Sequence, residues 1–162
     1  MYQSLSKLHG SSVSFDATGS VVRRLSRPTD KSGHIFLHQG VLSAQSGVHT
    51  SVVQMLSEKY NIDSIANWLS EWHRAGPPIP KEAVSDFSLA ILESLVKAFA
   101  PQPDLRSFIN ACFGVLLGHS DCQLPPCFIR VDVAHCIKLI TRCECLQNKG
   151  RRVEGLSTAF AM

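Results

Sequence analysis

The sequence predicts an α/β fold in which a three-stranded antiparallel meander is followed by strand–helix units in one mixed sheet. Before residue 58, three segments alternate apolar and polar residues and are joined by short polar links, which is typical of a meander. After residue 58, apolar residues recur mainly at helical spacing, and two short apolar segments interrupt the helices. Right-handed crossovers would then place these later strands beside the first strand.

Length and composition place the chain among ordinary globular domains. With 162 residues, of which 44% are hydrophobic and 18% charged, it suits one domain and is unlike a disordered chain or a coiled coil. The net charge of +3 permits nucleic-acid binding without requiring it. No apolar run approaches the roughly 20 residues of a membrane span, and the N-terminus has no signal-type apolar region. We therefore expect a nuclear or cytoplasmic protein that is neither secreted nor bound to a membrane.

Each expected element follows from its local pattern. The strands are expected at 11–25, with a bend or bulge at Gly19, and at 34–43, 49–57, 82–86 and 127–132. The helices are expected at 58–74, 86–99, 104–118 and 133–140. Residues 1–10 are expected to be a lead-in, 11–146 a single domain and 147–162 a loosely ordered tail.

Two aspartates stand where a sheet of this kind could hold a ligand. Asp86 ends the strand at 82–86, and open α/β sheets bind ligands at the carboxyl ends of their strands. Asp16 interrupts the first strand, although aspartate is depleted in strands. Each has a structural alternative, because Asp86 could cap the following helix and Asp16 could form a hairpin turn with Gly19.

Six short motifs follow one another in the order of these elements, between about Ser11 and Leu146. They are Phe15-Asp16-Ala-Thr-Gly19, Gly40-Val-Leu42, Gln54-Met-Leu-Ser-Glu58, Trp68-Leu-Ser-Glu-Trp72, Val84-Ser-Asp86-Phe-Ser-Leu-Ala90 and Phe128-Ile-Arg-Val-Asp132-Val-Ala-His135. Together they resemble the transposase core of Mutator-like mobile elements and, more narrowly, transposon-derived proteins of animal genomes that carry this core. The resemblance implies a ribonuclease H-like fold and an ancestral metal-dependent DNA strand cleavage and transfer.

The resemblance also implies that Asp16 and Asp86 are the first two acidic residues of a DDE triad. Carboxylates hold Mg²⁺ or Mn²⁺, and two such ions can activate a water or a 3′-hydroxyl for attack on a phosphodiester. The family's third residue is a glutamate on a helix after the fifth strand, where this chain has only Glu144 and Glu154, in no matched motif. We therefore expect an incomplete C-terminal part, with Glu58 as another candidate ligand or simply a helix-terminal acid.

Asp132 and His135 follow the fifth strand, where related transposases carry a Cys-x-x-His or similar pair. Three residues apart on a helix, their side chains share one face. The pair is a candidate for binding metal or contacting DNA. The alternative is a hydrogen-bonded pair of histidine and carboxylate with a structural role.

The cysteines raise a rival interpretation, because all six lie between Cys112 and Cys145. Zinc prefers four thiolate or imidazole ligands in a tetrahedron, but the spacing of Cys122, Cys127, Cys143 and Cys145 does not match common zinc fingers. Zn²⁺ is therefore the less favoured cofactor.

Three hypotheses for function follow from the sequence. The first is a transposase-type catalytic domain that acts on DNA with Mg²⁺ or Mn²⁺, and homo-oligomer formation is a further expectation. The second is a non-catalytic, domesticated remnant that binds DNA or a protein. The third is a small interaction module stabilised by zinc.

Overall fold

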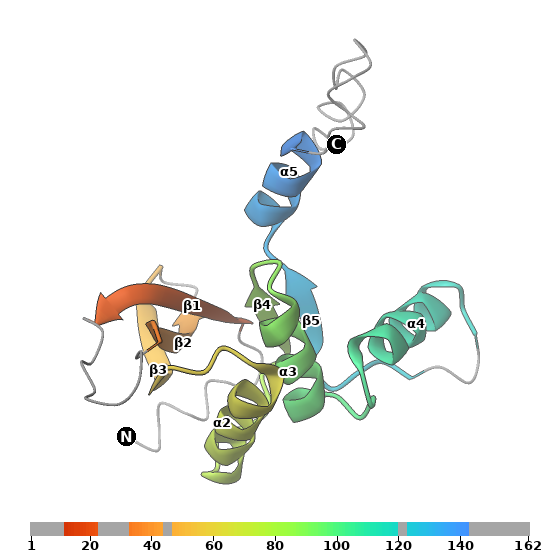
Figure 1. Cartoon of the computed structure of the whole chain (residues 1–162). Helices are drawn as coiled ribbons and strands as arrows, with labels where there is room; N and C mark the ends of the chain where they lie inside the picture. The colour runs from red at the N-terminus through yellow and green to blue at the C-terminus, as the bar shows by residue number, and fades with distance from the viewer. Residues whose placement is uncertain (1–11, 23–32, 44–46, 120–122, 143–162) are drawn as a thin grey trace.

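Nine elements make up the part of the chain that the computed structural model describes, which is residues 12–22, 33–43, 47–119 and 123–142. In chain order they are β1 (Ser12–Val22), β2 (Ile35–Ser43), β3 (His49–Ser57), α2 (Ile62–Arg74), β4 (Glu82–Ser85), α3 (Leu89–Phe99), α4 (Leu105–Leu116), β5 (Phe128–Val131) and α5 (Val133–Arg142). This is the order that the sequence predicts (Figure 1). The expected lead-in at 1–10 and tail at 147–162 lie outside the described residues.

The five strands form one mixed sheet in the order β3-β2-β1-β4-β5. β1 pairs antiparallel with β2, and β2 pairs antiparallel with β3, which is the expected meander. β4 pairs parallel with β1, so the first crossover brings the chain back beside β1 as expected. β5 pairs parallel with β4 and forms the edge of the sheet, so it does not lie beside β1. The mixed α/β fold is therefore confirmed, and it is consistent with a ribonuclease H-like architecture.

β1 continues through Asp16 without forming a turn. Asp16 pairs with Gln39 of β2, and the register between the two strands shifts only between Gly19 and Val22. The predicted hairpin turn at Asp16–Gly19 is therefore wrong, whereas the predicted bulge beside Gly19 is confirmed. Because side chains alternate along a strand, Asp16 points to the face opposite that of Phe15.

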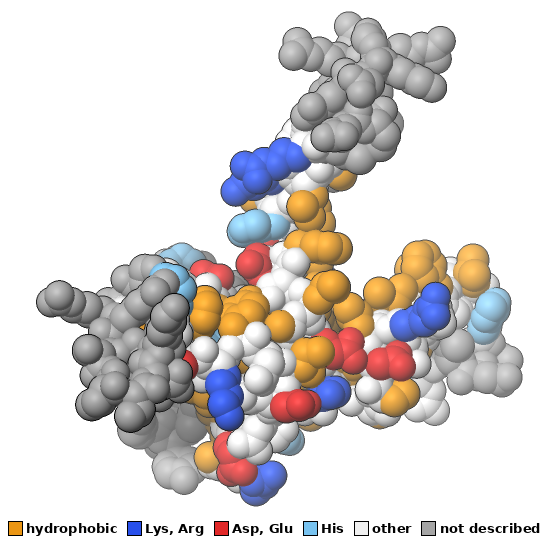
Figure 2. Space-filling model, in the orientation of Figure 1, with side chains coloured by type: hydrophobic (Ala, Val, Ile, Leu, Met, Phe, Trp, Pro, Cys, Tyr) orange, Lys and Arg blue, Asp and Glu red, His pale blue; other side chains and the backbone are white. Residues whose placement is uncertain are grey.

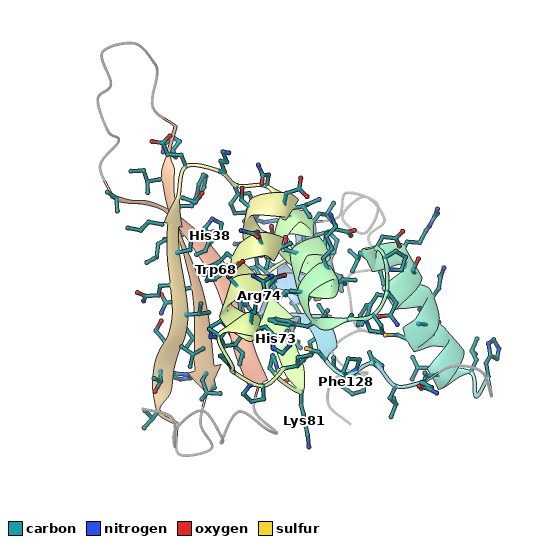
Figure 3. The ribbon with its side chains drawn as sticks, turned by 90° about the horizontal axis from the view of Figure 1, so that it is seen from below. His38, Trp68, His73, Arg74, Lys81 and Phe128 are labelled. Atoms are coloured by element: carbon teal, nitrogen blue, oxygen red, sulfur yellow. The ribbon has the colours of Figure 1, made fainter. Side chains whose placement is uncertain are left out.

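The face of the sheet that carries Phe15 is covered by α2 and α3, which lie side by side (Figures 1 and 3). The core formed there consists of Val13, Phe15, Ile65, Leu69, Ala83, Ile91, Leu95, Phe99 and Cys127. The Phe15 ring lies between the two helices, with its centroid 6.3 Å from that of Trp72 and 6.0 Å from that of Phe99. Burying a side chain of this kind contributes about 1.5–3 kcal/mol, so this face supplies much of the stability.

Side-chain caps determine where the helices begin. Asn61 Oδ1 accepts a hydrogen bond from the amide of Ser64 at 2.9 Å, and α2 therefore starts at Ile62 rather than at Glu58. Ser88 caps α3 in the same way. Glu58 consequently lies in the link between β3 and α2, and its interpretation as a helix-terminal acid is wrong.

The side of the molecule formed by α4, β5 and α5 displays many apolar side chains (Figure 2). α5 leaves the end of β5 and projects away from the sheet, and none of its residues is buried (Figure 1). On the face of the sheet that carries Asp16, Leu56 of β3 is 59% exposed and Phe128 of β5 is 48% exposed.

None of the described helices is both long enough and apolar enough to span a membrane.

Gly40 is predicted to be essential for the packing of Phe15. A Cβ atom at Gly40 would lie 2.7 Å from Val53 Cγ1 and 2.9 Å from Phe15 Cε1, closer than real Cβ contacts allow. We expect Gly40→Ala to lower the free energy of unfolding by about 1–3 kcal/mol, measured by urea denaturation with tryptophan fluorescence.

Gly19→Ala is the matched control for Gly40→Ala. The nearest atom to its added Cβ would be Phe36 Cε1 at 3.4 Å, an ordinary contact. We expect this variant to be unchanged or more stable by up to about 1 kcal/mol, because alanine loses less conformational entropy than glycine on folding. Equal stability of the two variants would contradict the proposed packing.

Candidate functional site

The parallel register aligns three aspartates across the sheet. Ser85 of β4 stands opposite Phe15 of β1 and opposite Val131 of β5. One residue further along each strand are Asp16, Asp86 and Asp132, and the amide of Asp132 continues the ladder by donating to the Ser85 carbonyl at 2.7 Å. Neighbouring strands lie about 4.8 Å apart, so Asp16 and Asp86 stand next to each other, as do Asp86 and Asp132.

The carboxylate of Asp86 is oriented by its own loop. Its Oδ1 accepts hydrogen bonds from the Ser85 hydroxyl at 3.3 Å and from the Ser88 amide at 3.2 Å. Ser88, not Asp86, is the N-cap of α3, since the Ser88 hydroxyl accepts from the amide of Ile91 at 3.4 Å. The helix-capping role considered for Asp86 is therefore wrong, and the side chain instead holds the short turn between β4 and α3.

The carboxylate of Asp16 is also oriented by a hydrogen bond from the neighbouring backbone. Its Oδ1 accepts a hydrogen bond from the amide of Ala17 at 2.7 Å. Within the described part of the chain, the hydrogen bonds of Asp16 and Asp86 all involve Oδ1, and Oδ2 of each carboxylate accepts none. Among the described residues, each of these two aspartates on adjacent strands therefore has one carboxylate oxygen without a hydrogen-bond donor.

Tyr60 is a residue near both carboxylates that the sequence reasoning did not identify. Its hydroxyl lies 2.5 Å from Ser88 Oγ. Burial raises the pKa of Tyr60, the hydrogen bond with Ser88 acts in the opposite direction, and the charges of Asp86 and Asp16 raise the pKa further. The phenol therefore stays protonated and lies within electrostatic reach of both aspartates.

His38 supports Tyr60 from the core. The His38 ring stacks on that of Tyr60, with centroids 5.6 Å apart, and lies 6.1 Å from the ring of Trp68, toward which it points in Figure 3. His38 is 1% exposed, and neither its Nε2 nor Trp68 Nε1 has a hydrogen-bond partner in the described structure. Burial lowers the pKa of His38, while a hydrogen bond with the backbone of Lys59 opposes this effect, so the ring is held neutral.

Asp132 and His135 form a hydrogen-bonded pair at the start of α5. His135 Nδ1 lies 2.9 Å from Asp132 Oδ2. This hydrogen bond lowers the pKa of the Asp132 carboxyl. Acidic and histidine side chains are visible together where α5 leaves the sheet (Figure 2). The structural alternative for these two residues is thus present, and it engages Oδ2 of Asp132.

The described residues contain no group of three or more histidine, cysteine or acidic side chains arranged to hold a metal ion. Glu58 lies in the β3–α2 link, close to Gly33, rather than in a cluster with the two aspartates. Of the candidate zinc ligands, Cys127 is fully buried, and burial raises its pKa to about 12, which keeps it a thiol. Cys122, Cys143 and Cys145, together with Glu144 and Glu154, lie outside the described residues.

The most informative similarity is to a protein of a mobile element. The chain is 40% identical over 137 residues to the 120.7 kDa protein in the NOF-FB transposable element of Drosophila melanogaster. This similarity supports a transposon-derived origin. The match covers 85% of this chain and 13% of the Drosophila protein. No protein-family model matches the sequence, and no solved structure matches it.

The neutral, buried state of His38 predicts a pH-dependent stability. Its pKa in the folded protein lies below the ordinary value of 6.5, so the unfolded chain binds a proton first as the pH falls. We expect the free energy of unfolding to decline as the pH drops from 7.5 through 6.5 and below. His38→Phe, which cannot titrate, should show a shallower decline in urea denaturation, and an identical decline in both proteins would contradict this role.

Proposed function

We propose that this chain is the catalytic-core region of a Mutator-like, DDE-type transposase, whose reaction is metal-dependent cleavage and transfer of DNA strands. The observation that supports this proposal best is the register that brings Asp16 and Asp86 together on adjacent parallel strands. The sheet order and the transposon-derived origin agree with it. DNA is accordingly the proposed substrate, and a nuclear location and self-association stay predictions.

The donor set fits a small divalent cation. Mg²⁺ prefers oxygen ligands and is commonly held by one or two carboxylates, with water and substrate phosphates completing its coordination. Asp16 and Asp86 offer one carboxylate oxygen each, and the remaining oxygen of each is already satisfied by a protein donor. A pair of this kind would hold Mg²⁺ or Mn²⁺ without requiring a further cluster of ligands.

The chain's own groups have distinct parts in such a site. Bound divalent cations would supply Lewis-acid stabilisation of charge at the phosphodiester. Asp16 and Asp86 would orient the bound DNA phosphate by holding its counter-ion, and the loop bonds of Asp86 would keep that carboxylate in place. Tyr60, with its protonated phenol, would add no negative charge beside the incoming phosphate.

A second function is favoured by one specific observation. Asp132 completes the row of aspartates, but its Oδ2 is hydrogen-bonded to His135, and the described residues include no third ligand in reach of the pair. A chain with two available carboxylates suits the binding of a cation and of DNA better than a full catalytic cycle. A non-catalytic DNA-binding domain of transposon origin is therefore the second candidate.

The first test is Mn²⁺ binding, measured by titration calorimetry on the protein and on Asp16→Asn and Asp86→Asn. Each variant is nearly isosteric but loses the charged oxygen that a cation needs, so we expect the dissociation constant to rise about tenfold or more. Asp63→Asn is the matched control, because Asp63 is a 93% exposed carboxylate on α2, where it pairs with Lys97. This control should bind Mn²⁺ as the unmodified protein does.

Nicking of supercoiled DNA in Mn²⁺ separates the two functions. The catalytic proposal expects nicking that disappears in Asp16→Asn and in Asp86→Asn. Binding of Mn²⁺ and DNA without nicking supports the second function. A folded protein that binds no Mn²⁺ would overturn the metal site and the catalytic proposal with it.

A further inference from the structure

We propose that Tyr60 is a positioning residue for the Asp16–Asp86 pair, an inference that rests on the proposed metal site. The Tyr60 hydroxyl lies 2.5 Å from Ser88 Oγ, and the amide of Ser88 donates to Asp86 Oδ1 at 3.2 Å. These two bonds fasten the β3–α2 link to the short loop that carries Asp86. Tyr60 thereby sets the orientation of the Asp86 carboxylate with respect to Asp16.

The Tyr60 ring is held firmly enough to act in this way. Its centroid lies 5.0 Å from that of Phe36 and 5.6 Å from that of His38, and both residues belong to β2. His38 is itself buried between the sheet and α2, where it approaches Trp68 (Figure 3). A continuous line of contacts therefore runs from the core, through the phenol, to the loop. Groups that bind a metal need such support, because small displacements of a ligand cost affinity.

The bond from Tyr60 is more than a completion of the helix cap. Ser88 already caps α3 by accepting a hydrogen bond from the Ile91 amide at 3.4 Å, and this contact does not involve Tyr60. The phenol adds a separate bond across 28 positions of sequence to the same hydroxyl. It makes this bond beside two carboxylates whose charges both reach it. The position of Tyr60 therefore relates it to the aspartates as well as to the helix.

The decisive variant is Tyr60→Phe, which removes the hydroxyl and keeps the ring that packs on Phe36 and His38. We expect its dissociation constant for Mn²⁺, measured by calorimetry, to rise about tenfold, the lower end of what losing an outer-shell partner costs a metal site. Ser88→Ala removes the same bond, together with the cap of α3, and should also weaken Mn²⁺ binding. The double variant should bind Mn²⁺ no more weakly than Ser88→Ala alone, because the Tyr60–Ser88 bond can be lost only once. Ser88→Thr keeps a hydroxyl and should bind Mn²⁺ nearly as the unmodified protein does.

Ile65→Val separates positioning from a general loss of stability. Ile65 is a core residue of α2 that is 1% exposed, and its truncation typically costs about 0.5–1.5 kcal/mol. The affinity of the Ile65→Val variant for Mn²⁺ should be unchanged. An unchanged affinity in Tyr60→Phe would overturn the role of Tyr60 and leave the metal site standing. Absence of Mn²⁺ binding by the folded, unmodified protein would overturn the metal site and this inference together.

Discussion

The parallel pairing of β4 with β1 is the constraint on which the rest of the structure depends. It aligns Ser85 with Phe15 and therefore brings together two segments that are far apart in the sequence. The pairing is stabilised from one side, where Phe15 packs against Trp72 of α2 and Phe99 of α3. Gly40 on the neighbouring strand leaves the space that the Phe15 ring occupies. The Phe15 ring therefore packs both helices against the sheet beside β1 and β4. Because a shift of one residue would turn every side chain to the other face, this packing also determines which residues line the opposite face.

Because of that register, one face of the sheet forms the core and the other face carries the aspartates. Residues in phase with Phe15 enter the core, and residues one step out of phase, such as Asp16, point the other way. An aspartate in a central strand would be costly if it faced α2 and α3, because a buried carboxylate needs a partner for its charge. On the opposite face it remains exposed. The same alternation that builds the core thus leaves carboxylates side by side.

The order of the elements could be predicted from the sequence because it depends on local periodicity and capping. The position of Asp86 after a strand could be recognised for the same reason, although the helix cap proved to be Ser88. Tyr60 and His38 could not be found in this way. Tyr60 lies in a link with no periodic pattern and meets Ser88 only through the tertiary fold, and His38 is buried because α2 packs over it. Interactions of this kind depend on the sheet order, which propensity and spacing do not contain.

Strand spacing also determines which of the three aspartates are direct neighbours. Adjacent strands are about 4.8 Å apart, so Asp16 and Asp132, with β4 between them, are separated by roughly twice that distance. Asp86, on the strand between them, is therefore the direct neighbour of both. The hydrogen bond from His135 to Asp132 Oδ2 reduces what the Asp86–Asp132 pair could offer to a cation. In the described structure, Asp16 and Asp86 each accept hydrogen bonds through Oδ1 only, so the proposed cation site is better supported between these two residues.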